Sequence, residues 1–360
     1  MGLPKIDIRF ESLAATAIKR SGNGVVALIL KDDTKNFDTK EYTNFDEVKA
    51  EDWTTTNLDY ISKAFLQSKT EQVGVPAKVI IERIPVNSEN YTDALERLKN
   101  KKWNYLAIPG IKLGDTATIV DWVKKMRDVN NKVFKCVLPN TEADCEGIIN
   151  FATEDIVVGD KTYSASEYTA RIAGILAGIP FTRSSTYFRL DEIDSIKESL
   201  DPDEDVDAGK LILINDGSGI KIGRGVNSLK TTSKAKGESF KKIKIVEAID
   251  LMREDIRTTF ENEYVGKVTN TYDNKILFLT SINDYLKLLQ YESVLNSDME
   301  AKVRIDSEAQ KKYLISKGID ITNLKDQEIK EYNTDSRVFI CGSVSPLDAM
   351  EDLEFGMIIA

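Results

Sequence analysis

Residues 78–139 hold the stretch that decides the fold, where five segments follow one another: KVIIERI (78–84), YTDALERLKN (91–100), WNYLAIPG (103–110), DTATIVDWVKKMRD (115–128) and KVFKCVLP (132–139). The first, third and fifth segments are short apolar runs, the pattern of buried strands. The second and fourth repeat apolar residues at helical spacing. Strands separated by helices of roughly ten to fifteen residues are typical of βαβ units. The stretch therefore predicts a central α/β domain with a parallel sheet.

The segments on either side extend this pattern. SGNGVVALIL (21–30) predicts a buried strand after a glycine-containing turn. GIINF (147–151) and DIVVGD (155–160) add two short strands. Residues 164–178 predict a helix whose first turn Ser164 caps.

The last third of the chain mixes helices with antiparallel strands. A hairpin is predicted over residues 210–225, with Asn215–Gly219 as its turn. Long amphipathic helices are predicted over residues 240–260 and 275–290, because apolar residues recur there every three or four positions. The remaining elements are two strands and a helix, at residues 301–306, 335–344 and 307–317. This region is therefore predicted to be a C-terminal α+β domain.

These elements divide the chain into five expected parts. They are an N-terminal arm (1–20), a small α/β subdomain (21–100), the central α/β domain (101–209), the C-terminal α+β domain (210–345) and a C-terminal arm (346–360). We expect both arms to be extended β-strands.

Both arms alternate apolar with polar residues, as half-buried strands do. The apolar residues are Ile6, Ile8 and Phe10 near the start, and Leu353, Phe355, Met357 and Ile359 near the end. Such a strand needs a sheet edge, which can belong to its own chain or to a neighbour. If each subunit donates strands to the next without closing a ring, a helical polymer results. The alternation alone leaves both possibilities open.

The composition is that of a globular protein and restricts its chemistry. The 360 residues are 41% hydrophobic and 30% charged, with a net charge of −10, which argues against general binding to nucleic acid or to anionic membranes. Histidine is absent, which excludes Ser–His–Asp and Cys–His catalysis and zinc sites with imidazole ligands. No run approaches the roughly 18 apolar residues of a membrane span. The opening MGLPKIDIRF (1–10) lacks an apolar secretory core, so we expect a cytoplasmic protein. An enzyme that uses carboxylate or lysine chemistry remains an alternative.

Two motifs suggest ligands but fail on spacing. DGSGIKIGRG (216–225) lacks the Gly-Lys-Ser/Thr of a phosphate-binding loop, and Ile222 stands where G-x-G-x-x-G requires its last glycine. DPDEDVDAG (201–209) spaces its aspartates like a calcium loop, but Val206 and Ile212 stand where that loop needs Gly and Glu. A hairpin turn and an exposed acidic loop are the simpler interpretations, and we expect no cofactor and no metal.

A basic strip begins at the hairpin and continues into the first long helix. Its cations are Lys221, Arg224, Lys230, Lys234, Lys236, Lys241, Lys242 and Lys244, with Glu238 as the one acidic residue among them. On an acidic protein, such a strip suggests a surface that faces an acidic partner. A solvated face with long side chains explains it equally well.

Three stretches together resemble a known family. RGVNSLKTT (224–232) follows the hairpin and precedes the lysine-rich helix, and ENEYVGKVTNTYDNK (261–275) connects the two long helices. The third is the opening GLPKIDIRFESLAATAIKRSGNGVVALIL (2–30). The chain resembles a contractile tail sheath protein over essentially its whole length. It is most similar to the short sheaths of Gram-positive phages, defective prophages and phage-tail-like bacteriocins.

This resemblance implies a mechanical function. Sheath subunits stack in six-fold helical layers around an inner tube, linked by terminal arms that add strands to neighbouring subunits. The sheath contracts when triggered at the baseplate and drives the tube through a cell envelope. By resemblance, the apolar arm residues named above are the linking side chains, and the basic strip faces the tube or an acidic neighbour, with Lys230, Lys234, Lys236, Lys241, Lys242 and Lys244 as its candidates.

The resemblance also implies a set of partners and a location. The partners are other copies of the chain, the tube protein, and baseplate and tail terminator proteins, but neither nucleic acid nor a membrane. The chain would assemble in the cytoplasm of a bacterial host and leave in a tail or bacteriocin particle. A baseplate or terminator role within the same tail is the narrower alternative to a sheath.

Overall fold

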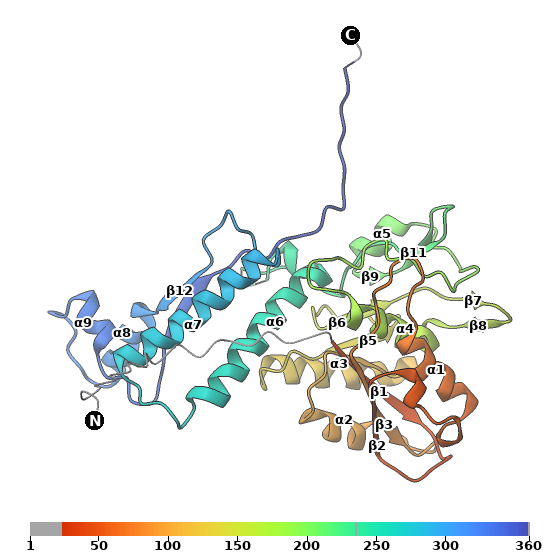
Figure 1. Ribbon diagram of the computed structural model, residues 1–360, viewed down its shortest axis with the longest axis horizontal. Helices are drawn as coiled ribbons and strands as arrows, with labels where there is room; N and C mark the ends of the chain where they lie inside the picture. The colour runs from red at the N-terminus through yellow and green to blue at the C-terminus, as the bar shows by residue number, and fades with distance from the viewer. Residues whose placement is uncertain (1–23, 235, 359–360) are drawn as a thin grey trace, which may run out of the picture. The chain divides into compact units, whose positions relative to one another are not determined.

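The computed structural model describes residues 24–234 and 236–358 and contains two compact units (Figure 1). The first, here called the sheet unit, comprises residues 24–251 and 348–358. The second, here called the helical unit, comprises residues 252–347. The N-terminal arm lies outside the described residues.

A seven-stranded sheet forms the centre of the sheet unit. Its strands lie in the order β2-β3-β1-β4-β5-β6-β9, and all neighbours are parallel except β2 and β3. The strands are β1 (Val25–Lys31), β2 (Thr39–Tyr42), β3 (Lys78–Ile84), β4 (Tyr105–Ala107), β5 (Lys135–Pro139), β6 (Ile148–Phe151) and β9 (Lys210–Leu211). The predicted parallel α/β sheet is confirmed.

Helices cover both faces of this sheet, so its strands are buried on two sides (Figure 1). Leu28 on β1 packs into the same cluster as α1 (Thr55–Phe65) and α4 (Ala165–Gly178). The next residue, Ile29, packs into the cluster of α2 (Thr92–Lys99) and α3 (Leu113–Asp128). The side chains of successive strand residues thus pack into cores on opposite faces of the sheet. Because both faces are buried, the strand sequences are continuous apolar runs.

Helix α4 is buried almost all round and requires glycine where it meets α1. A Cβ atom at Gly174 would lie 2.2 Å from the main-chain oxygen of Ala64, which excludes any larger residue without a shift of the backbone. The predicted Ser164 cap is confirmed, because Ser164 and Glu167 form a reciprocal capping box.

The short elements of the sheet unit confirm one prediction and correct another. The predicted hairpin is present as β10 (Leu213–Asn215) and β11 (Ile220–Ile222). The expected acidic loop is instead a helix, α5 (Pro202–Asp207), because Asp201 accepts a hydrogen bond from the Glu204 N–H at 3.0 Å and caps it. The other short elements are β7 (Ile156–Val158), β8 (Lys161–Tyr163), η1 (Phe45–Glu47), η2 (Ala50–Asp52) and η3 (Glu238–Lys241).

The boundaries of the two units differ from those expected from sequence. Strand β1 lies between β3 and β4, so one sheet continues across the expected boundary at residue 100. Strand β9 extends the same sheet beyond residue 209, and the sheet unit ends within α6. Parallel pairing brings together strands that are distant in sequence, and local patterns do not record that order.

The helical unit is α+β, as predicted. It contains the end of α6 (Ile243–Thr259), a π-helical turn (Phe260–Tyr264) and the long helix α7 (Tyr272–Tyr291). The remaining elements are β12 (Lys302–Ile305), α8 (Ser307–Ser316), α9 (Asp326–Glu331) and β13 (Ile340–Ser343), with β12 and β13 antiparallel. In the described part of the chain, no helix is long and apolar enough to cross a membrane.

A buried ionic cluster fixes the first half of α6 to the sheet. The Asp250 carboxylate on α6 accepts hydrogen bonds from Arg127 Nη1 on α3 at 2.9 Å and from Lys135 Nζ on β5 at 3.2 Å. Asp250 is 3% exposed. Burial alone would raise its pKa, but Lys135 and Arg127 hold the pKa of Asp250 below its ordinary value. The carboxylate is therefore charged and compensated inside the protein.

We expect Asp250→Ala to lower the free energy of unfolding by about 3–5 kcal/mol, because it leaves Arg127 and Lys135 buried without their shared anion. Urea unfolding followed by circular dichroism measures this change. Asp284→Ala is the matched control, since it removes an exposed pair with Lys287 on α7 and should leave the midpoint nearly unchanged. Equal effects of the two substitutions would show that the cluster does not stabilise the fold.

Candidate interaction site

The last described residues form a tail with two different halves. We call residues 348–352 the tail root and residues 353–358 the tail tip. The root carries three carboxylates, Asp348, Glu351 and Asp352, which contact cations from an earlier part of the sheet unit. The tip carries apolar side chains, which are exposed.

Two cations of the basic strip bind the tail root. Arg224 Nη2 donates hydrogen bonds to both carboxylate oxygens of Asp352, at 2.5 and 2.6 Å. Lys242 Nζ forms an ion pair with Asp348 and lies 3.4 Å from Glu351 Oε2. The bidentate geometry at Arg224 fixes the direction of the carboxylate as well as its position.

Two hydroxyl groups complete the clamp around Glu351. Glu351 Oε1 accepts hydrogen bonds from Ser184 Oγ at 2.8 Å and from Thr186 Oγ1 at 2.6 Å. The Glu351 side chain is only 5% exposed, in contrast to 79% for Asp352. Glu351 is therefore the inserted residue of the root. We call the contacts of Arg224, Lys242, Ser184 and Thr186 with the root the tail clamp.

The electrostatics of the tail clamp favour its charged state. Burial alone would lower the pKa of Lys242, but its ion pairs with Asp348 and Glu351 raise that pKa above the ordinary lysine value. The hydrogen bond from Arg224 lowers the pKa of Asp352. Both shifts favour the charged forms of Lys242 and Asp352.

The backbone near the clamp explains part of the RGVNSLKTT motif. Gly225 N–H donates to Thr186 Oγ1 at 2.9 Å, and Ile243 N–H donates to the Gly225 carbonyl at 2.9 Å. A Cβ atom at Gly225 would lie 2.5 Å from Ser185 Oγ. Glycine at this position therefore lets the strip and the loop after α4 approach each other closely enough for both to contact the tail root.

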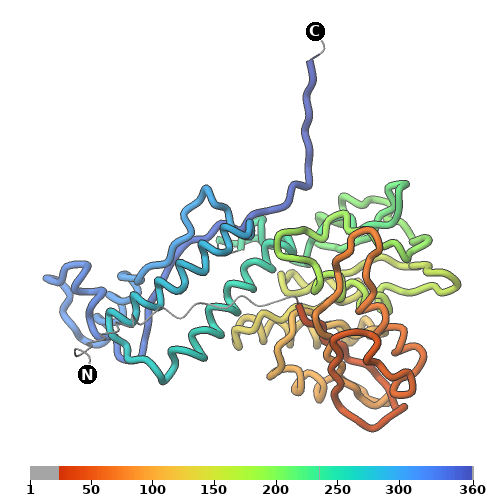
Figure 2. Tube along the Cα trace, in the orientation of Figure 1, coloured from red at the N-terminus to blue at the C-terminus, as the bar shows by residue number. Residues whose placement is uncertain are grey.

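The tail tip exposes the side chains that the alternation singled out. The exposed fractions are 88% for Leu353, 75% for Phe355 and 74% for Met357, and Ile358 is 95% exposed. Figure 2 shows the described end of the chain as an extended trace. Within residues 24–234 and 236–358 the tip has no strand partner. Ile6, Ile8, Phe10 and Ile359 lie outside the described residues.

The rest of the basic strip is largely neutralised by carboxylates of the same unit. The pairs are Lys230–Glu142 at 2.6 Å, Lys236–Glu146 at 2.8 Å and Lys241–Glu238 at 2.8 Å, together with Lys221–Asp216 in the hairpin. Lys234 is exposed, and Lys244 is buried. The strip is therefore less positive than its sequence suggests, because its acidic partners come from distant segments.

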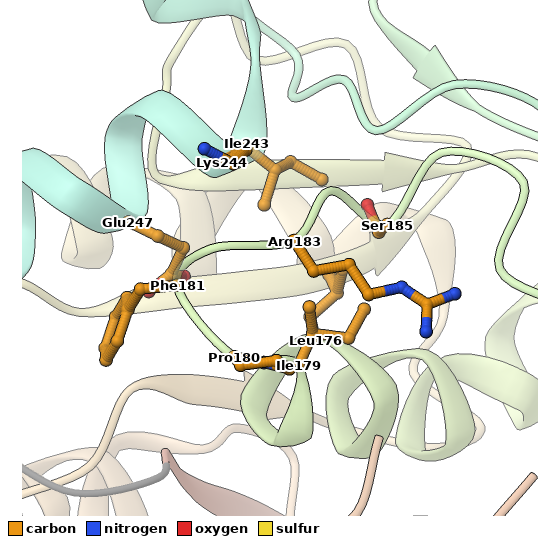
Figure 3. Close-up of a pocket in the computed structure, with 9 residues that line it drawn as sticks. All are labelled: Leu176, Ile179, Pro180, Phe181, Arg183, Ser185, Ile243, Lys244 and Glu247. Carbon is orange, nitrogen blue, oxygen red and sulfur yellow. The ribbon is translucent and has the colours of Figure 1, made fainter. Parts of the chain in front are cut away.

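A small pocket lies beside the clamp, between the end of α4 and the start of α6. Figure 3 shows Leu176, Ile179 and Ile243 lining it, with Ser185 at its edge. Its volume of about 20 Å³ holds roughly one water molecule, so it does not accommodate a cofactor. Among the described residues, no group of three or more acidic or cysteine side chains is arranged to hold a metal ion.

The carboxylates of the clamp are not among the site residues predicted from sequence. Asp348, Glu351 and Asp352 precede the apolar alternation, and their charge is opposite to that of the strip. This opposite charge could have predicted from sequence that the end of the chain contacts the strip. Ser184 and Thr186 gave no comparable signal, because hydroxyl residues in a loop have many roles.

Comparison with known proteins gives a consistent result across the chain. Residues 85–228 match the family model of the phage tail sheath protein central domain. Residues 235–360 match the model of the phage tail sheath C-terminal domain. The tail sheath protein of Clostridium phage phiCD119 is 41% identical over 355 residues, which cover 98% of each chain. A protein of the phage-like element PBSX of Bacillus subtilis is 28% identical and covers 68% of this chain and 59% of its own length.

Solved structures share the fold. A sheath tail protein from Desulfitobacterium hafniense superposes with a TM-score of 0.68 at 16% identity, covering 84% of this chain and 94% of that one. A chain from the anti-feeding prophage baseplate gives a TM-score of 0.68 at 10% identity, covering 100% and 99%. A chain from the contracted PVC sheath complex, an extracellular contractile injection system, gives 0.66 at 11% identity, covering 99% and 98%.

Two family models and a full-length relative therefore agree with the resemblance predicted from sequence. The matched family consists of structural tail proteins, which confirms the prediction that the chain is not an enzyme. The chain belongs to the phage tail sheath protein family.

Proposed function

We propose that the chain polymerises helically around an inner tube, joined through its terminal arms, and contracts to drive that tube through a cell envelope. The observation that carries the proposal is the two-part tail, with a clamped root and an apolar tip that no strand pairs with within residues 24–234 and 236–358. A tail built only to close its own fold would bury its tip as well as its root.

The tip supplies the free energy for joining subunits. Full burial of an apolar side chain of this size stabilises by about 1.5–3 kcal/mol, before the entropy of ordering the tip is subtracted. Leu353, Phe355, Met357 and Ile358 together are enough to join two subunits if each finds apolar cover. Because the clamp already orders the root, less entropy is lost when the tip binds.

The sheet of the helical unit supplies an acceptor edge. Val303 N–H on β12 donates to Asn283 Oδ1 at 2.8 Å, and Asn283 Nδ2 donates to the Val303 carbonyl at 3.3 Å. The outer edge of β12 is therefore occupied at Val303 by a side chain of α7. Among the described residues, β13 has a strand partner only on its β12 side.

The register of this sheet identifies the groups that would receive a strand. Val303 pairs with Gly342, and Ile305 pairs with Ile340. Since the main-chain groups of Val303 point away from β13, those of its opposite residue, Gly342, point away from β12. The same holds for Ile340, two residues earlier. We infer that the tip of one subunit adds to the outer edge of β13 in another.

The remaining surface of the basic strip has the tube as its proposed partner. An ion pair between exposed side chains of the strip and of the tube would contribute only about 0–1 kcal/mol. Contacts of this strength suit a sheath that must release its tube while the arms stay joined. Baseplate and terminator proteins are the proposed partners at the two ends of the polymer, and the cytoplasm of the host is the proposed place of assembly.

The triple variant Leu353→Ser/Phe355→Ser/Met357→Ser should abolish polymers, because it removes the apolar side chains of the tip and keeps the root. Negative-stain electron microscopy of the purified chain, with and without tube protein, is the measurement. The matched control is Leu288→Ser/Tyr291→Ser/Ile315→Ser, which changes exposed apolar residues of the helical unit. Helical cylinders from both triple variants would rule out a link through the tip.

The double variant Arg224→Ala/Lys242→Ala should release the tail root. Amide hydrogen exchange of residues 348–352 in the free subunit should become faster by roughly tenfold, the equivalent of about 1.4 kcal/mol. Lys230→Ala/Lys241→Ala is the control, since these lysines pair with Glu142 and Glu238 rather than with the tail. Unchanged exchange in the first variant would mean that the clamp does not hold the root.

Charge reversal at Lys234→Glu/Lys241→Glu should weaken co-sedimentation with preformed tubes and leave the tail clamp intact. The loss should shrink as salt is raised, because exposed charge contacts are screened. Self-assembly without tubes serves as the control. Wild-type co-sedimentation at low salt would exclude a tube-facing role for this part of the strip.

A further inference from the structure

A pocket in the helical unit has no role in the function proposed so far. It lies at the π-helical turn Phe260–Tyr264, the loop before α7 and the segment before β13. Its volume is about 500 Å³, which is within the range of ligand-binding sites. The apolar side chains that line it are Phe260, Tyr264, Val265, Val268, Phe278 and Val338. We call it the aromatic pocket.

Three rings form one wall of the aromatic pocket. The ring centroids of Tyr264 and Phe278 lie 4.7 Å apart, and those of Phe260 and Phe278 lie 5.1 Å apart. Phe278 is buried against the other two rings, whereas Phe260 and Tyr264 are half-buried, so these two rings are the ones that a further aromatic side chain would contact. Val265 and Val268 are 55% and 40% exposed at its mouth. The wall is therefore apolar and open to a partner.

A π-helical turn is rare and occurs frequently at functional sites. Here it carries Phe260 and Tyr264 on one wide turn, directly before the loop that supplies both valines. This is the ENEYVGKVTNTYDNK stretch that contributed to the family resemblance. Much of that stretch therefore lines the aromatic pocket.

The polar part of the pocket favours an occupant that brings acceptors. Lys275 lines the pocket, is 4% exposed, and donates from Nζ to Thr334 Oγ1 at 3.0 Å. Asp335 also lines it, but its carboxylate already accepts from Tyr313 Oη at 2.6 Å and pairs with Lys317 at 3.2 Å. A main-chain carbonyl or a carboxylate of an incoming segment would improve the environment of the Lys275 ammonium.

We propose that the aromatic pocket receives Phe355 from the tail tip of a second copy of this chain. The inference rests on the proposed function and specifies the anchor that sets the register of the exchanged strand. Phe355 is the aromatic residue of the tip, and 75% of it is exposed in the single chain. Glu354 beside it provides the acidic character that a pocket containing Lys275 favours.

The position of the pocket supports this occupant. Ser336 and Val338 line the pocket and directly precede β13, the proposed acceptor strand. A strand of six residues extends about 20 Å, at about 3.3 Å per residue. With Phe355 at the pocket beside Ser336 and Val338, the three residues that follow it extend about 10 Å, which is far enough to pair with the first residues of β13 at Ile340. Backbone pairing would then give affinity, and the pocket would give register.

Photocrosslinking tests the proposal directly in the full-length chain. Phe355 is replaced by p-benzoyl-phenylalanine, polymers are assembled from a mixture of isotope-labelled and unlabelled chains, and crosslinked peptides are identified by mass spectrometry. We expect crosslinks between labelled and unlabelled chains at residues 260–278 and 336–338. The control places the same photoreactive residue at Tyr291, which is 89% exposed on α7, and should not crosslink to the pocket.

A second variant tests the pocket without changing the tail. Val268→Trp fills the mouth and should reduce the sedimented fraction of polymer at least tenfold, whereas Ile315→Trp, at an exposed position of α8, should not. Unaltered circular dichroism and thermal unfolding of Val268→Trp verify that the unit still folds.

The outcomes separate this inference from the proposed function. Polymers that form with Phe355 crosslinks outside the pocket, or with normal yield from Val268→Trp, would overturn the inference and leave the polymer intact. Crosslinks within one chain only would overturn it as well, since the occupant would then be the chain's own tail. Subunits that stay discrete even with tube protein would overturn both.

Discussion

The contacts of the charged Asp250 carboxylate hold helix α6 against the sheet of the sheet unit. Helix α6 continues from the sheet unit into the helical unit, and Asp250 holds its first half through Arg127 and Lys135. Arg127 also pairs with Glu146, which in turn binds Lys236 of the basic strip. The buried cluster and the surface strip are therefore one connected network. Because isolated buried charges are costly, such a network persists only when its members stay together, and it fixes the start of α6 where the tail clamp is built.

The tail combines two kinds of interaction that differ in strength and direction. Its root is held by ion pairs and hydrogen bonds, which define position and orientation. Its tip offers apolar surface, which supplies free energy but little direction. In the proposed polymer, directional contacts at the root followed by apolar residues at the tip would present the tip in a defined way to a partner. This division suits a joint that survives the rearrangement of neighbouring subunits, because weak surface contacts break while a tip buried in its partner stays in place.

Sequence patterns predicted the elements better than their assembly. The apolar runs at 78–84 and 132–139 and the Ser164 cap lie in local sequence, so the strands and helix α4 were predictable from it. The order of the strands was not, because β1 enters between β3 and β4 through parallel pairing. The apolar alternation of the tip was visible, whereas the insertion of Glu351 between Ser184 and Thr186 depends on loops that meet only in three dimensions. The basic strip was visible too, but its neutralisation by Glu142 and Glu146 was not.

A structural role also agrees with the way that the described residues use their carboxylates. The ionisable groups of the chain are used as ties between elements: Asp250 for α6, Glu351 for the tail, and Asp201 for the cap of α5. These carboxylates accept hydrogen bonds from cations, hydroxyls or main-chain N–H groups, and these bonds fix the positions of the elements that carry them. A catalytic acid or base instead needs room for a substrate and a proton that it can exchange with it. Carboxylates that are occupied as ties between elements give a subunit whose contacts depend on geometry, which suits the polymer proposed above.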